Sequence, residues 1–360
     1  MILTLRILSL VIPYCITICK CITFLLLPTS IKTLMEWIQN DWNTLEDVNE
    51  LEIIKKYANF GRLCTITFSV FSYSCAFALL LSVYLPDILN FVMPQNFSRE
   101  RNLLFDVEYF IDEQKYFYVI FYHLYISIIF GLTIVIATET LYVAYVNHAC
   151  GMFKIASYRL YHAYDQNVLQ ISPFIKNAVI HTKVAAAIEM HKRALKFHDF
   201  LWSKLGLHYF FMISIGVVSL SINFFRIFQA IVVIKSAEEL VLSGIFIAAH
   251  FIYIFCGNYA GQVFIDHSLG VHENICDSRW YRIPLRQQKL ILLILHRSMH
   301  SCKLVTGGIF ILSLEGFTSV IKNDHCEILS DFLHIFYTNV LLQLLAMSIS
   351  YFTVISSIQH

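Results

Sequence analysis

Charged residues are scarce in this chain of 360 residues: only 14% are Asp, Glu, Lys or Arg, whereas 58% are hydrophobic. A soluble domain carries about 25% charged residues, so too few are present to cover a water-facing surface. The formal net charge of +1 gives no basis for binding nucleic acid. With 12 glycines and 6 prolines, the composition excludes collagen-like repeats and low-complexity linkers.

Motifs of enzymes and metal sites are also missing. None of the ten cysteines forms a C-x-x-C pair, so we expect no disulfide framework. The sequence has no H-E-x-x-H, G-x-x-x-x-G-K-[ST], G-x-S-x-G or G-x-G-x-x-G. His148 and Cys150 stand two apart where an apolar run ends, which favours a polar membrane interface over a metal site. "NDHC" at 323–326 matches only part of the palmitoyltransferase signature. We therefore predict neither an enzyme nor a cofactor.

Long apolar runs, in contrast, are abundant. About 20 apolar residues are enough for a helix to cross the hydrocarbon of a bilayer. Because backbone groups cannot stay unpaired in lipid, such runs must be helical. The sequence therefore predicts an all-α polytopic transmembrane bundle with six to seven membrane helices. The candidate crossings are 7–27, 63–86, 116–146, 205–234, 240–265, 304–321 and 332–358.

The distribution of Lys and Arg predicts how the bundle is oriented. Seventeen of them lie in 28–62, 147–196 and 266–303, against four in 87–115 and 235–239. Cytoplasmic loops carry the excess of Lys and Arg, so the three richer segments are predicted to be cytoplasmic. The glycosylation sequon at Asn96 then falls in an outer loop, where it can be modified.

Four of the apolar runs are each interrupted by a single charge: Lys20, Glu139, Arg226 and Glu315. Intramembrane charges usually face a partner or a water-filled path. Glu315 fits either an ion path or a paired position near the cytoplasmic end of its run. Glu139 lies close enough to the cytoplasmic end to be a solvated or paired charge.

Aromatic residues recur at helical spacing in the outer halves of several runs. Spacing alone favours helix packing and interfacial anchoring. The alternative is an aromatic-lined pocket for a small apolar ligand. The residues concerned are Tyr73, Phe77, Tyr84, Tyr118, Tyr122, Phe246, His250 and Tyr253.

Nine blocks of the sequence, taken in order, resemble one known family. They include "IATETLYVAYVNHACGMFKIASYRL", "GVVSLSINFFRIFQ" and "SRWYRIPLRQQKLILLILHRS". Together they cover nearly the whole chain, which makes their ordered agreement specific. The family is that of insect odorant receptors, and the blocks are most similar to an ant, bee and wasp subfamily. The blocks are 58–63, 109–123, 136–160, 191–201, 216–229, 258–268, 278–298, 307–322 and 347–357.

The resemblance implies a fold of seven transmembrane helices with a cytoplasmic N-terminus and an outer C-terminus. It implies the tuning subunit of an odorant-gated, non-selective cation channel in the plasma membrane of sensory-neuron dendrites. Its partners would be small volatile odorants and a shared co-receptor in a hetero-tetramer. The family's pocket lies in the outer half of the helices, so the resemblance favours the pocket interpretation over helix packing for Phe77, Tyr84, Tyr118, Tyr122 and Phe246. His250 and the Tyr hydroxyls would give polar selectivity. Val354 and Ile358 become candidate gate residues of the pore, and Glu315 a candidate pore residue.

Three parts follow from the resemblance: ligand-binding helices in 1–265, a cytoplasmic anchor helix in 266–303, and a pore region in 304–360. Two features depart from the family. The run 7–27 matches the family's second helix, so the first is missing and Met1 is expected not to be the natural start. Residues 323–346 form an insert that cuts the seventh helix in two, either a retained intron or an additional element.

These two departures leave other functions open. The first alternative is a non-conducting receptor subunit or an incomplete gene-model fragment. The second is a transporter, although the inverted repeats of that class are not seen. A G-protein-coupled receptor ranks third, because the chain has no N-P-x-x-Y and no D/E-R-Y.

Overall fold

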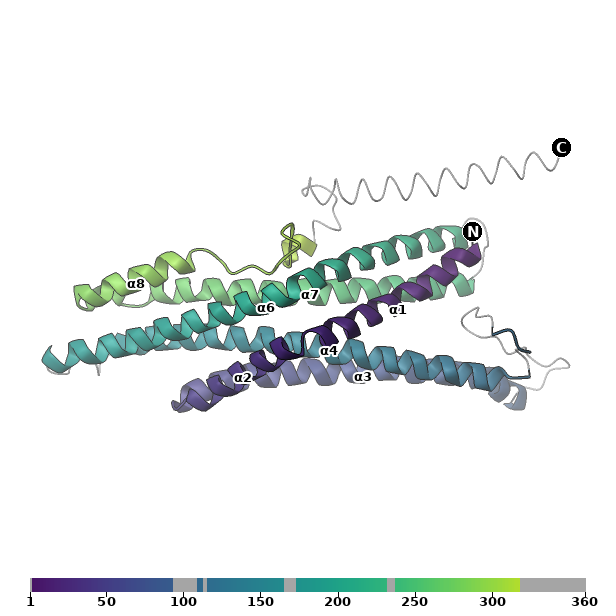
Figure 1. The fold of residues 1–360 in the computed structure, drawn as a ribbon, viewed down its shortest axis with the longest axis horizontal. Coiled ribbons are helices and arrows are strands. Elements are labelled where there is room, and N and C mark those ends of the chain that lie inside the picture. Colours follow the sequence, from purple (N-terminus) through teal and green to yellow (C-terminus); the bar gives the residue numbers. More distant parts are fainter. Residues whose placement is uncertain (1, 93–108, 113–114, 165–172, 232–236, 318–360) are drawn as a thin grey trace, which may run out of the picture.

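The computed structural model describes residues 2–92, 109–112, 115–164, 173–231 and 237–317. Long helices run side by side along the length of an elongated bundle (Figure 1). The elements are α1 (Ile2–Leu26), α2 (Pro28–Thr44), α3 (Val48–Val92), α4 (Phe117–Tyr161), η1 (His162–Tyr164), α6 (Pro173–Gln229), α7 (Ala237–Asp277), η3 (Trp280–Arg282), α8 (Leu285–Ser298), β1 (Val305–Thr306) and β2 (Phe310–Ile311).

Five of the helices are long and apolar enough to cross a membrane: α1, α3, α4, α6 and α7. They confirm that the first five apolar runs predicted to cross the membrane are helical where the structure describes them. Both α3 and α4 have 45 residues, or about 67 Å at 1.5 Å per residue, whereas the hydrocarbon is about 30 Å thick. The helices therefore extend well beyond the membrane, and the run 332–358 lies outside the described residues.

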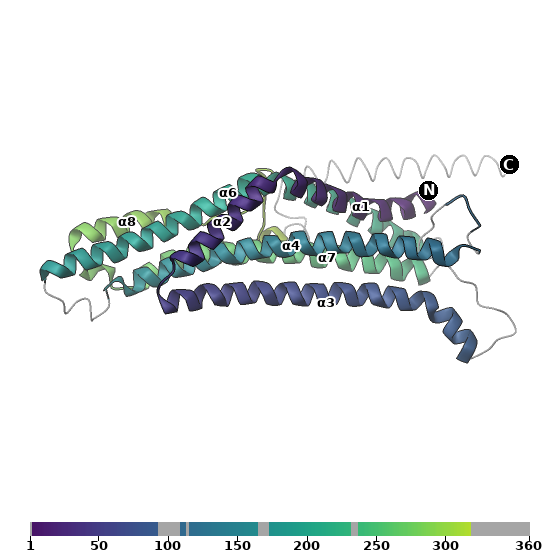
Figure 2. The same ribbon diagram turned by 60° about the horizontal axis from the view of Figure 1, so that its bottom comes forward.

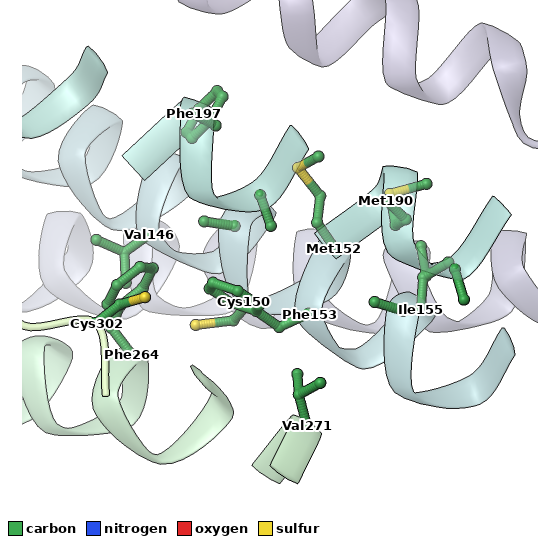
Figure 3. Close-up of a cluster of buried hydrophobic side chains, with 14 of the residues drawn as sticks. Val146, Cys150, Met152, Phe153, Ile155, Met190, Phe197, Phe264, Val271 and Cys302 are labelled. Atoms are coloured by element: carbon green, nitrogen blue, oxygen red, sulfur yellow. The ribbon is translucent and has the colours of Figure 1, made fainter. Parts of the chain in front are cut away.

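Packing differs between the two halves of the bundle. In the half that holds the basic segments, the end of α4, the start of α6, the end of α7 and α8 contribute to a dense apolar core. Figure 3 shows side chains of this core from α4, α6 and α7. Cys150, Phe153 and Val271 in that core have no exposed surface. In the other half, large apolar side chains such as Phe71 and Phe130 are exposed. The half with the dense core is thus suited to contact with water, and the half with exposed apolar side chains is suited to contact with lipid.

Ionic contacts join the helices of the water-facing half. Arg159 of α4 donates from Nε and Nη2 to the two carboxylate oxygens of Glu50 on α3, at 2.6 and 2.7 Å. His148 Nε2 lies 3.0 Å from Asp41 Oδ2 of α2, and Arg193 of α6 pairs with the same carboxylate. Burial lowers the pKa of His148, which lies beyond the 116–146 crossing, to about 4. His148 is thus a buried structural residue, and no group of potential metal ligands occurs among the described residues.

The predicted crossing at 304–321 is wrong for its described part. Residues 305–311 form a β-hairpin, in which Val305 pairs with Ile311 and Thr306 with Phe310. Gly307 and Gly308 make the turn with φ of 59° and 73°, a conformation that glycine adopts without strain. The strands lie about midway along the bundle (Figure 1).

Side chains of α7 bind the backbone of this segment and explain its departure from a helix. Asn258 Oδ1 accepts from the Ser313 amide at 3.1 Å, and Gln262 Oε1 accepts from the Leu314 amide at 3.2 Å. Gly261 lies between them and allows Leu312 to approach α7 closely. Polar groups that a helix would pair internally are thus satisfied by the bundle.

The expected anchor segment 266–303 is not one helix. α7 continues without a break across 265 and ends at Asp277, then η3 leads into the short helix α8. The expected boundary between 265 and 266 therefore lies inside α7. α8 packs along α6 and α7 (Figure 1).

Candidate functional site

Three of the predicted pocket residues meet at the outer ends of α3 and α4, which lie along each other (Figure 2). The rings of Tyr84 and Tyr118 stack with centroids 6.1 Å apart. The Tyr84 hydroxyl also hydrogen-bonds that of Tyr122. Tyr118 packs against the small apolar cluster of Val83, Phe117 and Phe121. This α3–α4 aromatic group (Tyr84, Tyr118 and Tyr122) combines an apolar wall with hydroxyls that can donate or accept.

Tyr73 and Phe77 lie further along α3, beside a hollow of about 440 Å³. All of its lining residues belong to α3: Ser69, Val70, Tyr73, Ser74 and Phe77. Because a single helix lines it, the hollow is open on one side, and Phe77 is 56% exposed. Tyr73 is tied to α4 by a 2.9 Å hydrogen bond between its hydroxyl and Thr133 Oγ1.

The α7 residues have different surroundings. His250 Nδ1 lies 2.7 Å from the Phe246 carbonyl oxygen one turn earlier. This contact makes Nδ1 the protonated nitrogen, so Nε2 is left as an acceptor. Tyr253 instead donates its hydroxyl to Glu139 Oε1 at 3.1 Å.

Glu139 belongs to an ionic cluster inside the bundle. It forms an ion pair with Lys20 of α1, whose side chain is 1% exposed. Lys20 Nζ lies 3.3 Å from the Tyr253 hydroxyl and 5.8 Å from the centroid of the Tyr209 ring. Of the two environments expected for Glu139, the paired one is therefore observed.

A second ionic cluster lies at the outer ends of α1, α6 and α7. Arg226 donates to Glu239 Oε2 at 2.8 Å and to Ser9 Oγ at 2.5 Å. Arg6 pairs with the same Glu239. Sequence reasoning found Arg226 as an intramembrane charge but missed these partners. The sequence does offer one indication of a partner for Arg226, because the acidic residue Glu239 directly precedes the run that begins at 240.

The two clusters set the register of α1 relative to α7, although α1 packs mainly on α6 and α4. Arg6 contacts Glu239, and Lys20 contacts Tyr253. Both pairs are separated by 233 residues, so the two helices run parallel in a constant register. α6 runs antiparallel to both and contacts them through Arg226. The predicted residues Phe246 and His250 thus lie on α7 between the two clusters.

Some predicted site residues cannot be placed in this way. Asn96, Val354 and Ile358 lie outside the described residues. Glu315 lies in the helical turn 314–317 that follows the hairpin. Its position on a docked segment differs from the continuous crossing that the sequence suggested.

Comparisons with known proteins agree with this architecture. A family model described as "7tm Odorant receptor" matches residues 2–324. The chain belongs to the odorant receptor family. No curated protein matches it closely in sequence. Two solved structures of the insect olfactory receptor OR5 from Machilis hrabei, one in complex with eugenol, share its fold at 13% identity. The first has a TM-score of 0.67 and covers 95% of this chain and 82% of OR5, and the second has a TM-score of 0.63 and covers 96% and 82%.

Family membership accounts for the helices that expose apolar side chains. An odorant receptor of this kind is a multi-pass membrane protein, and the five candidate spans fit that description. It is a receptor fold rather than an enzyme fold. The assignment to an ant, bee and wasp subfamily, the missing first helix and the 323–346 insert stay predictions.

Proposed function

We propose that this chain is the odour-tuned subunit of an odorant-gated, non-selective cation channel, and that it assembles with a shared co-receptor in the plasma membrane of sensory-neuron dendrites. The observation that carries the proposal is the family match over residues 2–324. A ligand that prefers the open arrangement shifts the population toward it. Channel opening by a volatile compound is then a consequence of differential binding.

The α3–α4 aromatic group supports a ligand site in the outer half. Tyr84, Tyr118 and Tyr122 come from two helices and join an apolar wall to two hydroxyls. Such a surface suits small apolar molecules with one polar group. Because one OR5 structure was solved in complex with eugenol, eugenol is a suitable first compound in a test panel.

The test is ligand-evoked current in cells that express the chain together with a co-receptor. A broad volatile panel should include at least one agonist, and Tyr118→Ala should raise the half-maximal concentration of that agonist about tenfold or more, because a ring stacked against Tyr84 is lost. Tyr116→Ala is the matched control, since Tyr116 precedes α4 and is exposed. Current that is absent across the panel, with surface expression verified, would contradict the proposal.

Two readouts distinguish the alternatives. Ligand binding without current from any co-receptor combination would indicate a non-conducting subunit. Uptake of a labelled ligand without current would indicate a transporter.

A further inference from the structure

Four polar atoms near the outer cluster are buried and have no hydrogen-bond partner within the part of the chain that the structure describes. They are Ser219 Oγ, Asn223 Oδ1, Arg226 Nε and Ser243 Oγ. Ser219, Asn223 and Ser243 have no exposed surface, and Arg226 is 4% exposed. Buried polar groups are normally hydrogen-bonded, because an unmade bond costs free energy. Four such atoms in one region indicate that a group outside the described residues completes them.

The residues that carry these atoms belong to α6 and α7, and the register of the two helices brings them to one region. Ser219, Asn223 and Arg226 follow at intervals of four and three residues, so they share one face of α6. The 2.8 Å bond from Arg226 to Glu239 brings that face against α7. Ser243 lies one turn inward from Glu239, as Asn223 lies one turn inward from Arg226. Because α6 and α7 are antiparallel, Asn223 and Ser243 lie at the same depth.

Neither serine of this group bonds the backbone of its own helix, and Asn223 does so only through its amide nitrogen. Ser214 and Ser221 on α6 donate to backbone carbonyls one turn earlier, at 3.0 and 2.8 Å. Ser219 and Ser243 have no such bond. Asn223 donates from Nδ2 to the Ser219 carbonyl at 2.8 Å, which assigns Oδ1 as the atom without a donor.

The region also has room for a ligand group. Gly216 is buried and lies one turn inward from Ser219 on the same face, yet a Cβ added there would meet nothing within 4 Å. A Cβ added at the half-buried Gly244, next to Ser243, would likewise meet nothing within 4 Å. Gly216 is thus a buried glycine beside open volume, one turn from the unpaired Ser219 hydroxyl, and such a place can receive a small group.

We propose that the α6–α7 polar site (Ser219, Asn223, Arg226 and Ser243) binds the hydroxyl group of a small aliphatic alcohol. The inference rests on the proposed function in that it takes the chain to bind volatile molecules, and it adds a site separate from the α3–α4 aromatic group. Asn223 Oδ1 can only accept, so it requires a donor, whereas Arg226 Nε can only donate. A hydroxyl group donates and accepts at once. A carbonyl or ether oxygen leaves Asn223 unpaired, and a hydrocarbon leaves every group unpaired.

The experiment measures binding to the purified full chain in detergent, without a co-receptor. The melting temperature is titrated with 1-octanol, its methyl ether and octane, since a ligand that binds only the folded state raises it. We expect 1-octanol to bind about tenfold or more tightly than the ether. Ser243→Ala and Asn223→Leu should reduce that ratio to about twofold or less, because they remove the groups that recognise the hydroxyl.

Ser221→Ala is the control variant. Its hydroxyl bonds the Val217 carbonyl of its own helix, so the preference for 1-octanol should persist. Ser243→Ala deletes one oxygen, which keeps the test valid if Asn223→Leu does not fold. Equal shifts with all three compounds, or a preference unchanged in both variants, would mean that only water completes the site and would overturn the inference. Alcohol binding in a chain that never conducts would leave the inference standing and contradict the proposed function.

Discussion

Lys20 of α1 and Glu139 of α4, 119 residues apart in the chain, form an ion pair inside the bundle. The Lys20 side chain is 1% exposed and that of Glu139 is 16% exposed. Tyr253 of α7 contacts both charges, at 3.3 and 3.1 Å. One pair of opposite charges thus joins three helices whose outer surfaces are apolar.

Removing one partner of this pair should destabilise the fold strongly. Lys20→Met leaves the largely enclosed Glu139 carboxylate without its charge partner, and the expected loss is about 3 kcal/mol. The double variant Lys20→Met with Glu139→Leu should recover much of that loss, because no charge remains. Thermal and denaturant unfolding in detergent measure both effects.

A matched control is the exposed pair Lys32 and Glu36 on α2, separated by 3.8 Å. Lys32→Met should change the free energy of unfolding by about 0.5 kcal/mol or less, since exposed pairs contribute little. If Lys20→Met has an equally small effect, the ion pair is not a determinant of the fold.

The sequence was sufficient for the features that depend on lipid as solvent. Apolar runs placed five crossings correctly, and the single charge in two of those runs, Lys20 and Glu139, turned out to be one pair. Single-sequence reasoning could not choose Lys20 as the partner, because such a choice depends on which helices pack together. Helical spacing placed Tyr118 and Tyr122 on one face of their helix. In the structure, Tyr84 of α3 contacts both of them.

The hairpin shows where hydropathy fails. Residues 304–312 are apolar because Leu304, Phe310 and Leu312 are buried against the bundle, and the sequence alone does not distinguish burial in protein from burial in lipid. The adjacent glycines 307 and 308 were a turn signal. The polar groups that receive the segment, on Asn258 and Gln262, lie some 50 residues away, so no local pattern includes them.

Arg159 provides a test of bidentate pairing in the water-facing half. Arg159→Lys keeps the charge but loses the two parallel bonds to Glu50 and the 3.1 Å bond to the Ala186 carbonyl. Because Lys is a point charge without the planar fork, we expect a loss of about 1–3 kcal/mol. The comparison is Arg286→Lys at an exposed position of α8, which should be neutral. Equal melting temperatures for the two variants would show that the bidentate geometry of the Arg159 guanidinium does not contribute to stability.

His191 should make the water-facing half sensitive to acid. It is 4% exposed in the 147–196 segment, and burial, followed by the nearby positive charge of Arg297, lowers its pKa to about 4. An unfolded histidine has a pKa of about 6.5, so the unfolded state binds the proton first as pH falls. The stability of the neutral folded form is therefore full above about pH 6.5 and declines toward pH 4.

The measurement is the melting temperature between pH 7.5 and pH 4.5. His191→Gln should flatten part of the decline, because its side chain does not titrate in this range. His300→Gln changes an exposed histidine and should leave the profile unaltered. An acid-induced decline that is identical in all three proteins would rule out His191 as its source.

Gly261 and Gly257 lie one turn apart on α7 and form a matched pair. A Cβ on Gly261 would lie 2.2 Å from the Leu312 carbonyl oxygen and 2.7 Å from its carbon, whereas a Cβ on Gly257 would meet nothing within 4 Å. Gly261→Ala must therefore displace backbone, at a cost of about 1–3 kcal/mol. Gly257→Ala should be neutral or stabilise α7 by up to about 1 kcal/mol, since alanine is the better helix former.

Displacement of the segment can be measured apart from stability. Cys302 is buried just before the hairpin, and its amide bonds Ser268 Oγ of α7 at 3.0 Å. If the hairpin docks as described, a maleimide should label Cys302 several-fold faster in Gly261→Ala than in Gly257→Ala, as quantified by mass spectrometry of the Cys302 peptide. Equal labelling rates would mean that the backbone of 302–312 does not depend on α7, and the segment would then be free to cross the membrane as its hydropathy first suggested.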